Sequence, residues 1–466
     1  DGMIPVEYAL LIGSALIIVS IGIARLSENL GVPVLLLFIG VGMLAGSEGP
    51  GGIYFDDAHL AQSVGVIALV FILFAGGLDT KWPEVKPVFR QATILATLGV
   101  FITAMTVGLF AFVVLKFSLL TGLLLGAVVS STDAAAVFSV LRSKQISLKG
   151  QLKPLLELES GSNDPMAVLL TIGIIEIIKN PETSLGSLSL LFILQMGLGL
   201  LFGLGFGKAL VFLLNRLKSY YEGVYPVFSL AFAALAYGAT ASVGGSGFLA
   251  VYLMGMVAGN SEFVYKKSLM RFFDGLAWLS QITMFLTLGL LVFPSRILQI
   301  IWAGLACSAF LMFVARPLSV FLTLPFEPLK WREKFLVSWV GLRGSVPVVL
   351  ATFPLLAGVA DSEAIFNIVF FIVLTSALLQ GWSIPVVARF LKLDAPMRIR
   401  RQYPIEYAPV RGVDTQLLEF IIPYSSAIAG KPIVELGLPP DSLIVLVNRD
   451  ENFFVPSGGS TLEGGD

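Results

Sequence analysis

The sequence has few charged residues for its length. Of its 466 residues, 13% are charged and 56% are hydrophobic, whereas soluble domains average about 25% charged residues. So little charge cannot cover the surface of a soluble protein of this size. The 30 basic and 31 acidic residues show no basic excess, so nucleic acid is not an expected partner. With 35 Phe and a mean hydropathy of +0.89, the chain is too apolar to be disordered. It is typical of a polytopic membrane protein.

Cysteine and histidine occur once each. A single cysteine, Cys307, excludes a disulfide scaffold, and we expect it to be an apolar packing residue. His59 lies in an acidic loop, where we expect it to be solvated. Without a second histidine, a Cys-His pair or a Gly-rich phosphate loop before a strand, no catalytic set is visible. We therefore do not expect an enzyme, since even an intramembrane enzyme would lack its nucleophile and base. The role of Lys208 stays open.

Long apolar runs dominate the sequence up to about residue 390. A bilayer crossing by a helix needs roughly 20 mostly apolar residues. We count thirteen such runs: 6–24, 32–46, 60–78, 88–115, 117–141, 155–178, 188–216, 222–242, 246–260, 265–293, 297–324, 333–360 and 363–391. The sequence thus predicts an all-α membrane protein of about thirteen spans.

The basic residues of the connecting segments predict the orientation of the spans. With the N-terminus outside, the inward loops and the segment after the last span carry 22 basic residues. The outward loops carry 3, which are Lys116, Lys179 and Arg296. Since basic residues stay on the cytoplasmic side, we expect the N-terminus outside, the C-terminus in the cytoplasm and membrane lipid around the spans.

The sequence pattern changes after residue 393, where the long apolar runs end. Residues 417–422 and 443–447 have the pattern of short strands, and the turn 448–452 leads into 453–455 as in a hairpin. We predict a transmembrane domain over 1–393 and a small cytoplasmic α/β domain over 394–466. A domain of this size is only marginally stable by itself, so we expect it to pair with a second copy. The chain starts at Asp1 and stops at Asp466 in mid-pattern, so we expect a piece of something longer.

Two of the predicted spans are interrupted by polar or small residues. The fifth contains Ser130-Ser131-Thr132-Asp133 within an apolar run, and the twelfth contains 341–347, which holds two glycines and a proline. Unwound backbone at membrane depth is tolerated where it lines a cavity or is buried in protein. Seven crossings separate the breaks, so the two helices are antiparallel, as in inverted repeats with a substrate site where the breaks meet. The alternative is that Gly and Pro only kink ordinary helices.

The sixth span carries carboxylates in its interior. Ser160 and Asp164 are one helical turn apart, and Glu157 lies near the same face. A carboxylate beside a hydroxyl offers hard oxygen ligands to a small cation or a proton. A buried Arg343 cannot lose its proton and needs an anionic partner, for which Glu159 is our choice. The alternative is a polar network with a structural role only.

These motifs carry a resemblance to a known family. At Thr132-Asp133, at residues 159–165 and at Gly341-Leu342-Arg343-Gly344, the chain resembles the bacterial NhaP-type monovalent cation:proton antiporters over roughly residues 5–392. The resemblance implies a homodimer of thirteen-helix protomers with inverted repeats and two broken, crossing helices, the NhaA-like antiporter fold. A core domain would move against a dimerisation domain.

The resemblance also implies roles for individual residues. Asp164 would be the carboxylate shared by cation and proton, and Thr132, Asp133 and Ser160 would complete the ion shell. Asn163 and a Glu159–Arg343 ion pair would hold the broken helices. An Asn before the key Asp marks electroneutral exchange in this family. Some sodium-selective members carry an acid in the third span, where this chain has 74–77 without one and Asp79 further along.

The C-terminal segment carries a second resemblance. Residues 442–458 resemble a TrkA-C (RCK-C) regulatory domain, here incomplete at Asp466. Such a tail implies the potassium/proton branch linked to cell-volume regulation, and a small regulatory ligand, commonly a nucleotide, with no other cofactor. The expected function is electroneutral exchange of cytoplasmic K⁺ for external H⁺ across a bacterial inner membrane. A sodium/proton antiporter is the alternative, and a ligand-gated cation channel is the alternative from another class, although no Thr-Val-Gly-Tyr-Gly-like filter is present.

Overall fold

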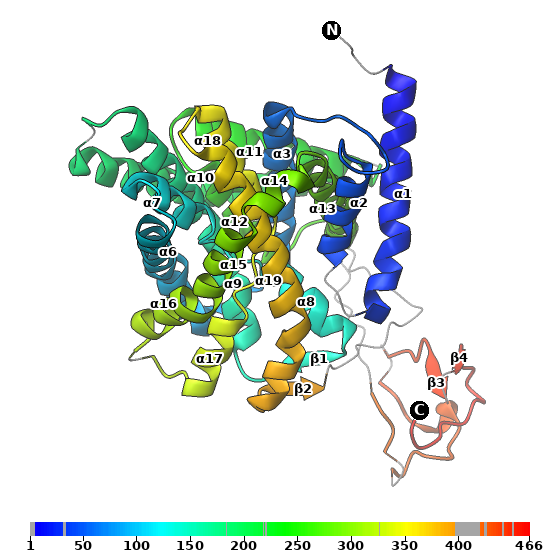
Figure 1. Ribbon diagram of the computed structural model, residues 1–466. Coiled ribbons are helices and arrows are strands. Elements are labelled where there is room, and N and C mark those ends of the chain that lie inside the picture. The colour runs from blue at the N-terminus through cyan, green and yellow to red at the C-terminus, as the bar shows by residue number, and fades with distance from the viewer. Residues whose placement is uncertain are drawn as a thin grey trace. The chain divides into compact units, whose positions relative to one another are not determined.

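The chain divides into two units, Asp1–Met397 and Arg398–Asp466. The computed structural model describes residues 5–30, 34–182, 184–217, 219, 221–325, 327–396, 420–423, 426–439, 442–449 and 452–466. The first unit is built almost entirely of helices, which cross one another as a bundle (Figure 1). Its only strands among the described residues are β1 (Ile146–Leu148) and β2 (Asp394–Pro396).

Helices that are long and apolar enough to cross a membrane make up most of the first unit. Among the described residues nine segments qualify: α1 (Val6–Leu30, through Ala24), α3 (Ala58–Asp79), a continuous run of α4 (Trp82–Val85), η1 (Lys86–Val88), α5 (Phe89–Ile94), η2 (Leu95–Gly99) and α6 (Val100–Val114), then α9 (Leu152–Lys179), α10 (Leu185–Arg216), α11 (Val224–Ser242), α13 (Lys266–Leu290), the run of α15 (Ile301–Phe310), η3 (Leu311–Ala315) and α16 (Arg316–Thr323), and α19 (Ser362–Phe390). The shorter helices are α2 (Val34–Ala45), α7 (Leu119–Val128), α8 (Ala134–Ser143), α12 (Gly247–Gly259), α14 (Pro294–Gln299), α17 (Trp331–Trp339) and α18 (Ser345–Ala357).

Every predicted apolar run coincides with a helix or with a broken pair of helices. The prediction of a mostly helical membrane protein with a small C-terminal domain is confirmed. The number of thirteen crossings stays a prediction, because several of the helices are too short to span a bilayer by themselves.

The two predicted helix breaks are present and lie against each other. Helix α7 ends at Val128 and α8 begins at Ala134, while α17 ends at Trp339 and α18 begins at Ser345. The backbone N–H of Asp133 in the first break donates to the carbonyl of Leu342 in the second at 2.8 Å. Each unwound segment therefore satisfies part of the other's backbone, which is what makes exposed peptide groups tolerable inside a membrane protein.

Glycines allow the backbones of α3 and α12 to approach closely. A β-carbon added to Gly255 would lie 2.4 Å from the carbonyl oxygen of Phe74, and one added to Gly259 would lie 2.1 Å from that of Leu78. Small residues at a helix crossing give this kind of packing in membranes. Helices α2 and α13 cross in the same way at Gly42 and Gly289. These four helices form one tightly packed group, in which little relative movement is possible.

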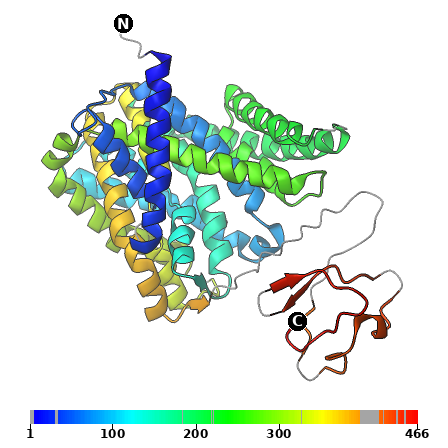
Figure 2. The ribbon, with the colours of Figure 1, turned by 90° about the vertical axis from the view of Figure 1, so that its right-hand side faces the viewer.

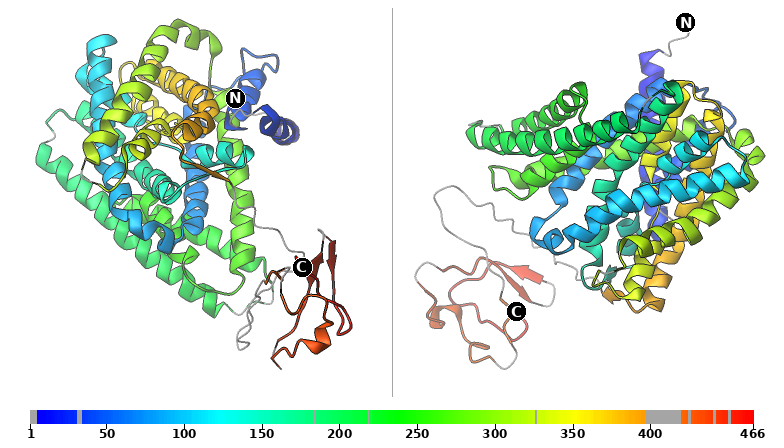
Figure 3. Two further views of the ribbon diagram at one scale, coloured as in Figure 1. Left: turned by 90° about the horizontal axis from the view of Figure 1, so that it is seen from below. Right: turned by 90° about the vertical axis from the view of Figure 1, so that its left-hand side faces the viewer.

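The remaining helices lie around this group. Helix α1 lies alongside α2 (Figure 2), and α10 and α11 lie side by side at one edge of the unit, next to α12 (Figure 3). A second group consists of α5 to α9 and α15 to α19. The two groups meet mainly where α18 crosses α3, at Gly65 and Val349, where an added β-carbon on the glycine would lie 2.7 Å from the valine side chain.

A short sheet ties the end of the first unit to the loop between α8 and α9. Strands β1 and β2 pair antiparallel, with Ser147 opposite Ala395. The pairing continues one residue further, since the N–H of Lys149 donates to the carbonyl of Leu393 at 2.9 Å. The segment that follows α19 is therefore fixed to the loop that joins α8 to α9.

The second unit contains the predicted hairpin. Strands β3 (Val447–Arg449) and β4 (Asn452–Phe454) pair antiparallel, and the turn residues 450–451 lie outside the described residues. The strand predicted at 443–447 is wrong in position, because only Val447 of that segment belongs to β3. Of the strand predicted at 417–422, residues 417–419 lie outside the described residues, and 420–422 are not in a strand. A short helical turn, η4 (Ile433–Glu435), and a small core of Ile422, Val447 and Leu462 complete the described part of the unit.

Candidate functional site

A cavity of about 530 Å³ lies in the first unit, and Asp164 is one of the residues that line it. Its wall is formed by both breaks and by residues of α2, α3, α8, α9, α12, α13 and α18. Asp164 lies near the middle of α9 and its side chain is buried. The hydroxyl of Ser131, in the first break, donates to its Oδ1 at 2.7 Å. A buried carboxylate that lines a cavity inside a membrane protein is a functional-site candidate, because an ionised side chain there costs free energy.

Three of the other predicted residues connect α9 to the first break. The hydroxyl of Ser160 donates to the carbonyl of Thr132 at 2.9 Å and accepts from the N–H of Ala134 at 3.0 Å. The side-chain amide of Asn163 donates to the hydroxyl of Thr132 at 2.6 Å. The structure therefore brings Thr132, Ser160, Asn163 and Asp164 together, with Asn163 contacting the break rather than the cavity.

Asp133 has a structural position as well as a place in the cavity wall. Its carboxylate accepts from the N–H of Ala136 at 3.1 Å and so caps the N-terminus of α8. The second break passes so close that a β-carbon on Gly344 would lie 2.0 Å from Asp133 Oδ2. Only glycine fits at position 344, which explains why the crossing of the breaks carries this residue.

Ser131 was not among the predicted site residues. The sequence marks the run 130–133 as polar, but it does not say which of its side chains faces the carboxylate. Helical periodicity assigns faces only within a helix, and this segment is unwound. Ser130 illustrates the difficulty, because its hydroxyl turns back to the carbonyl of Ala127 at 2.6 Å and does not reach Asp164.

The buried ion pair differs from the predicted one. Glu159 Oε1 lies 2.6 Å from Nη2 of Arg316, and both side chains are almost fully buried. Arg343, the predicted partner, interacts electrostatically with Glu159, but among the described residues its three guanidinium nitrogens have no hydrogen-bond partner. A role for Arg343 beside Glu159 stays a prediction. Arg316 comes from a helix that sequence spacing does not connect with α9. Its position on α16 beside the second break places it next to Glu159.

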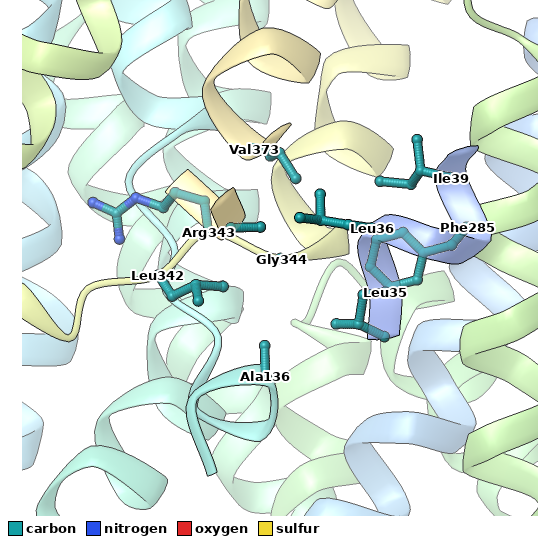
Figure 4. Close-up of a pocket in the computed structure, with 10 residues that line it drawn as sticks. Leu35, Leu36, Ile39, Ala136, Phe285, Leu342, Arg343, Gly344 and Val373 are labelled. Carbon is teal, nitrogen blue, oxygen red and sulfur yellow. The ribbon is translucent and has the colours of Figure 1, made fainter. Parts of the chain in front are cut away.

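Arg343 itself is 1% exposed. Its backbone borders a small apolar pocket between the second break and Leu35, Leu36 and Phe285, while its guanidinium points away from these side chains (Figure 4). Its N–H donates to the hydroxyl of Ser376 at 3.1 Å. The residue is thus fixed through its backbone at the crossing of the two breaks.

Further acidic residues line the same cavity away from Asp164. They are Asp79 at the end of α3, Glu157 on α9 and Asp274 on α13, and the cation among them is Arg142 of α8. Glu157 also lies 3.6 Å from Lys153. Asp79 is the carboxylate closest in sequence to the third-span position that lacks an acid, and it lines the cavity that leads to Asp164. The sequence showed these acids but not that one cavity joins them.

Comparisons with known proteins show the family of the chain. Residues 15–390 match the family described as sodium/hydrogen exchanger, transmembrane, and residues 417–466 match the TrkA-C domain. The K(+)/H(+) antiporter NhaP2 of Shewanella sp. (strain ANA-3) is 42% identical over 462 residues, covering 98% of this chain and 79% of that protein. The K(+)/H(+) antiporter NhaP of Alkalimonas amylolytica is 42% identical over 454 residues, covering 96% and 78%.

A solved structure has the same fold. The sodium proton antiporter MjNhaP1 from Methanocaldococcus jannaschii, determined at pH 8, superposes with a TM-score of 0.73 at 24% sequence identity, covering 83% of this chain and 99% of that one. This likeness concerns the fold. The family matches span both units, and the sequence relatives cover nearly the whole chain. The chain belongs to the sodium/hydrogen exchanger family of membrane transporters and carries a TrkA-C domain after its membrane-spanning part.

Proposed function

We propose that this protein is an electroneutral K⁺/H⁺ antiporter of a bacterial inner membrane, which exchanges cytoplasmic K⁺ for external H⁺. The observation that carries the proposal is the position of Asp164 in the wall of the cavity, where it accepts a hydrogen bond from Ser131 and lies one helical turn from Ser160. The names of two relatives, both K(+)/H(+) antiporters with 42% identity, support the choice of potassium.

One carboxylate is sufficient to couple the two ions. Asp164 in its ionised form binds a monovalent cation with the help of the hydroxyl of Ser131 and the carbonyl of Thr132, which are oxygen ligands suited to hard cations. In its protonated form it has no charge to hold the cation. Since Asp164 binds either a proton or a cation, the site carries one positive charge in both directions. The exchange is therefore one for one and indifferent to membrane potential.

The neighbouring residues also support a site with one exchanging carboxylate. Asn163, the residue before Asp164, is neutral and donates to Thr132. Asp133 is bound to the N-terminus of α8 by the hydrogen bond that caps this helix. Asp164 is thus the carboxylate in the cavity wall that we propose to exchange a proton for a cation.

The division into two groups of helices supports a proposal of alternating access. The group of α2, α3, α12 and α13 is held together by glycine crossings, and the group that contains both breaks and α9 packs against it. With the N-terminus outside, Asp79 and Arg142 in the cavity wall lie on the cytoplasmic side, and the crossing of Gly65 with Val349 lies on the outer side. This arrangement is an inward-facing state. Movement of the second group against the first would open the outer side and expose Asp164 there.

Regulation by the cytoplasmic domain has a structural route within the first unit. Strand β2 immediately precedes the linker to the second unit and pairs with β1, which begins three residues after the end of α8. A displacement of β2 would therefore move the loop between α8 and α9. Helix α8 follows the first break, and α9 carries Asp164. A small ligand such as a nucleotide, bound to the TrkA-C domain, would act through this strand. We also propose a homodimer, in which the small domains pair.

The test is cation-driven proton movement in proteoliposomes, with K⁺, Na⁺ and Li⁺ compared and the membrane potential either clamped or free. We expect exchange with K⁺ that does not respond to the potential, with Asp164→Asn inactive and Asp361→Asn active. Asp361 is a suitable control because it is exposed and has φ of 61°, a conformation that Asn also adopts readily. Exchange with Na⁺ alone would contradict the choice of potassium, and cation currents without proton coupling would indicate a channel.

A further inference from the structure

Helix α9 approaches α12 closely beside the candidate site. Gly161 lies on α9 three residues before Asp164 and directly after Ser160. A β-carbon added to Gly161 would lie 2.4 Å from Cζ of Tyr252 and 2.6 Å from its hydroxyl oxygen. Real β-carbons do not approach other atoms so closely, so the phenol ring of Tyr252 lies directly on the backbone of α9.

Tyr252 is held firmly by the group of helices to which it belongs. Its side chain is 2% exposed, and its hydroxyl lies 3.3 Å from the hydroxyl oxygen of Thr80. Because the hydroxyl of Thr80 donates to the carbonyl of Gly76 at 2.8 Å, its oxygen is the acceptor for Tyr252. The backbone is also fixed, since a β-carbon on Gly77 would lie 2.3 Å from the carbonyl oxygen of Tyr252. The ring therefore has little freedom to move away from α9.

Helix α9 is easier to displace at this turn. Pro165 lies inside the helix and has no N–H to donate to the carbonyl of Gly161, four residues earlier. The missing helical hydrogen bond spans the turn that carries Asp164. Since the backbone of α9 is weakened here and Tyr252 is rigid, the contact between Gly161 and the ring decides how far this turn approaches α12.

We propose that Tyr252 is a positioning residue of the cation site. By stopping α9 at Gly161, its ring sets the location of Asp164 and Ser160 relative to Ser131 and Thr132 of the first break. The affinity for the cation depends on this distance, because oxygen ligands must lie at the separation that the ion demands. This inference rests on the proposed function of Asp164 and adds a residue from the other group of helices. Tyr252 also lines the cavity, so the contact is made where the ion passes.

The test introduces a steric clash with one substitution and removes it with a second. Gly161→Ala places a methyl group against the ring, and Tyr252→Leu removes the atoms that it would meet. We expect Gly161→Ala to raise the K⁺ concentration for half-maximal exchange by on the order of tenfold, because small misplacements of a site are costly. The double variant Gly161→Ala/Tyr252→Leu should restore much of this loss. Gly173→Ala is the matched control, since it lies on the same helix and its added β-carbon would meet nothing within 4 Å.

Two results would overturn the inference. One is a Gly161→Ala variant with unchanged K⁺ dependence, and the other is a loss that Tyr252→Leu does not relieve. If Gly161→Ala does not fold, Tyr252→Leu and Tyr252→Phe are measured alone. Tyr252→Leu should then change the half-maximal K⁺ concentration and Tyr252→Phe, which keeps the ring, should change it less. An unchanged Tyr252→Leu would contradict the proposal.

The same series separates this inference from the proposed function. If wild type exchanges K⁺ and Asp164→Asn does not, while the Gly161 and Tyr252 variants behave like wild type, only the role of Tyr252 fails. If wild type moves no protons in response to any cation, the proposed function fails. K⁺-dependent protection against thermal unfolding then tests Tyr252 without transport, because the inference still requires Gly161→Ala to weaken that protection.

Discussion

The hydroxyl of Ser131 donates a hydrogen bond of 2.7 Å to Oδ1 of Asp164. Both side chains are buried, and they come from different elements: Ser131 from the unwound first break and Asp164 from the middle of α9. In the proposed mechanism, this contact joins two elements that must remain together for a cation to meet its ligands. Ser131 and Asp164 both line the cavity.

Loss of this hydroxyl should weaken cation binding. Ser131→Ala removes one candidate oxygen ligand and one hydrogen bond to a carboxylate, an interaction worth about 1.5–3 kcal/mol. We expect a higher K⁺ concentration for half-maximal exchange in proteoliposomes. Ser130→Ala is the matched control, because the hydroxyl of Ser130 bonds to the carbonyl of Ala127 and not to Asp164. Equal effects of the two substitutions would contradict the role of Ser131.

Replacement of Arg316 should destabilise the protein more than replacement of Arg343. Arg316→Met leaves Glu159 as a buried charge without its ion-pair partner, which costs about 3–5 kcal/mol. Arg343→Met removes a guanidinium that forms no hydrogen bond among the described residues and leaves the Glu159–Arg316 pair intact. The midpoint of thermal unfolding in detergent measures the difference. A larger decrease of this midpoint for Arg343→Met than for Arg316→Met would indicate that Arg343 is the main partner of Glu159.

Pairing of β1 with β2 should be required for regulation. Ala395→Pro removes a backbone donor and disturbs the ladder opposite Ser147. If the cytoplasmic unit acts through β2, removal of residues 398–466 changes the exchange rate of the wild type but not that of Ala395→Pro. Asp394→Asn keeps the backbone pairing and serves as the control. An Ala395→Pro variant that still responds to the truncation would exclude this route.

The second unit should lose stability at low pH through Asp466. Two hydrogen bonds from Arg449, at 2.9 and 2.7 Å, hold the pKa of this carboxyl below its ordinary value of 3.8. A lowered pKa in the folded state means that the stabilisation is complete above pH 3.8 and is lost as the pH falls through the folded-state value. Hydrogen exchange at Ile422 and Gly465, corrected for the intrinsic pH dependence of amide exchange, should therefore accelerate in acid. Asp466→Asn should accelerate it at neutral pH, and unchanged exchange there would contradict the argument.

The elements whose sequence pattern is local were predictable. Apolar length placed the helices, and the polar run 130–133 together with the glycines around Arg343 placed the two breaks. Asp164 and Ser160 were found because they share a face of one helix. For these residues the relevant spacing lies within a single span, where the geometry of the α-helix connects sequence with position.

The relationships between spans were not predictable in the same way. Arg316 and Glu159 are 2.6 Å apart but belong to helices far apart in the sequence, and charge balance alone favoured Arg343 equally. Ser131 and Tyr252 reach the site through an unwound segment and a helix crossing, for which no periodicity exists. Such contacts are decided by how helices pack against each other, and one sequence does not contain that information in readable form.

The central claim is that one carboxylate, Asp164, binds either K⁺ or a proton. It is tested most directly by proton release when K⁺ is added to the purified protein, measured by calorimetry in buffers of different ionisation enthalpy. We expect K⁺ to displace a proton from the wild type and from Asp361→Asn, and to displace none from Asp164→Asn. Proton release that persists in Asp164→Asn, with K⁺ still bound, would show that another group carries the exchange.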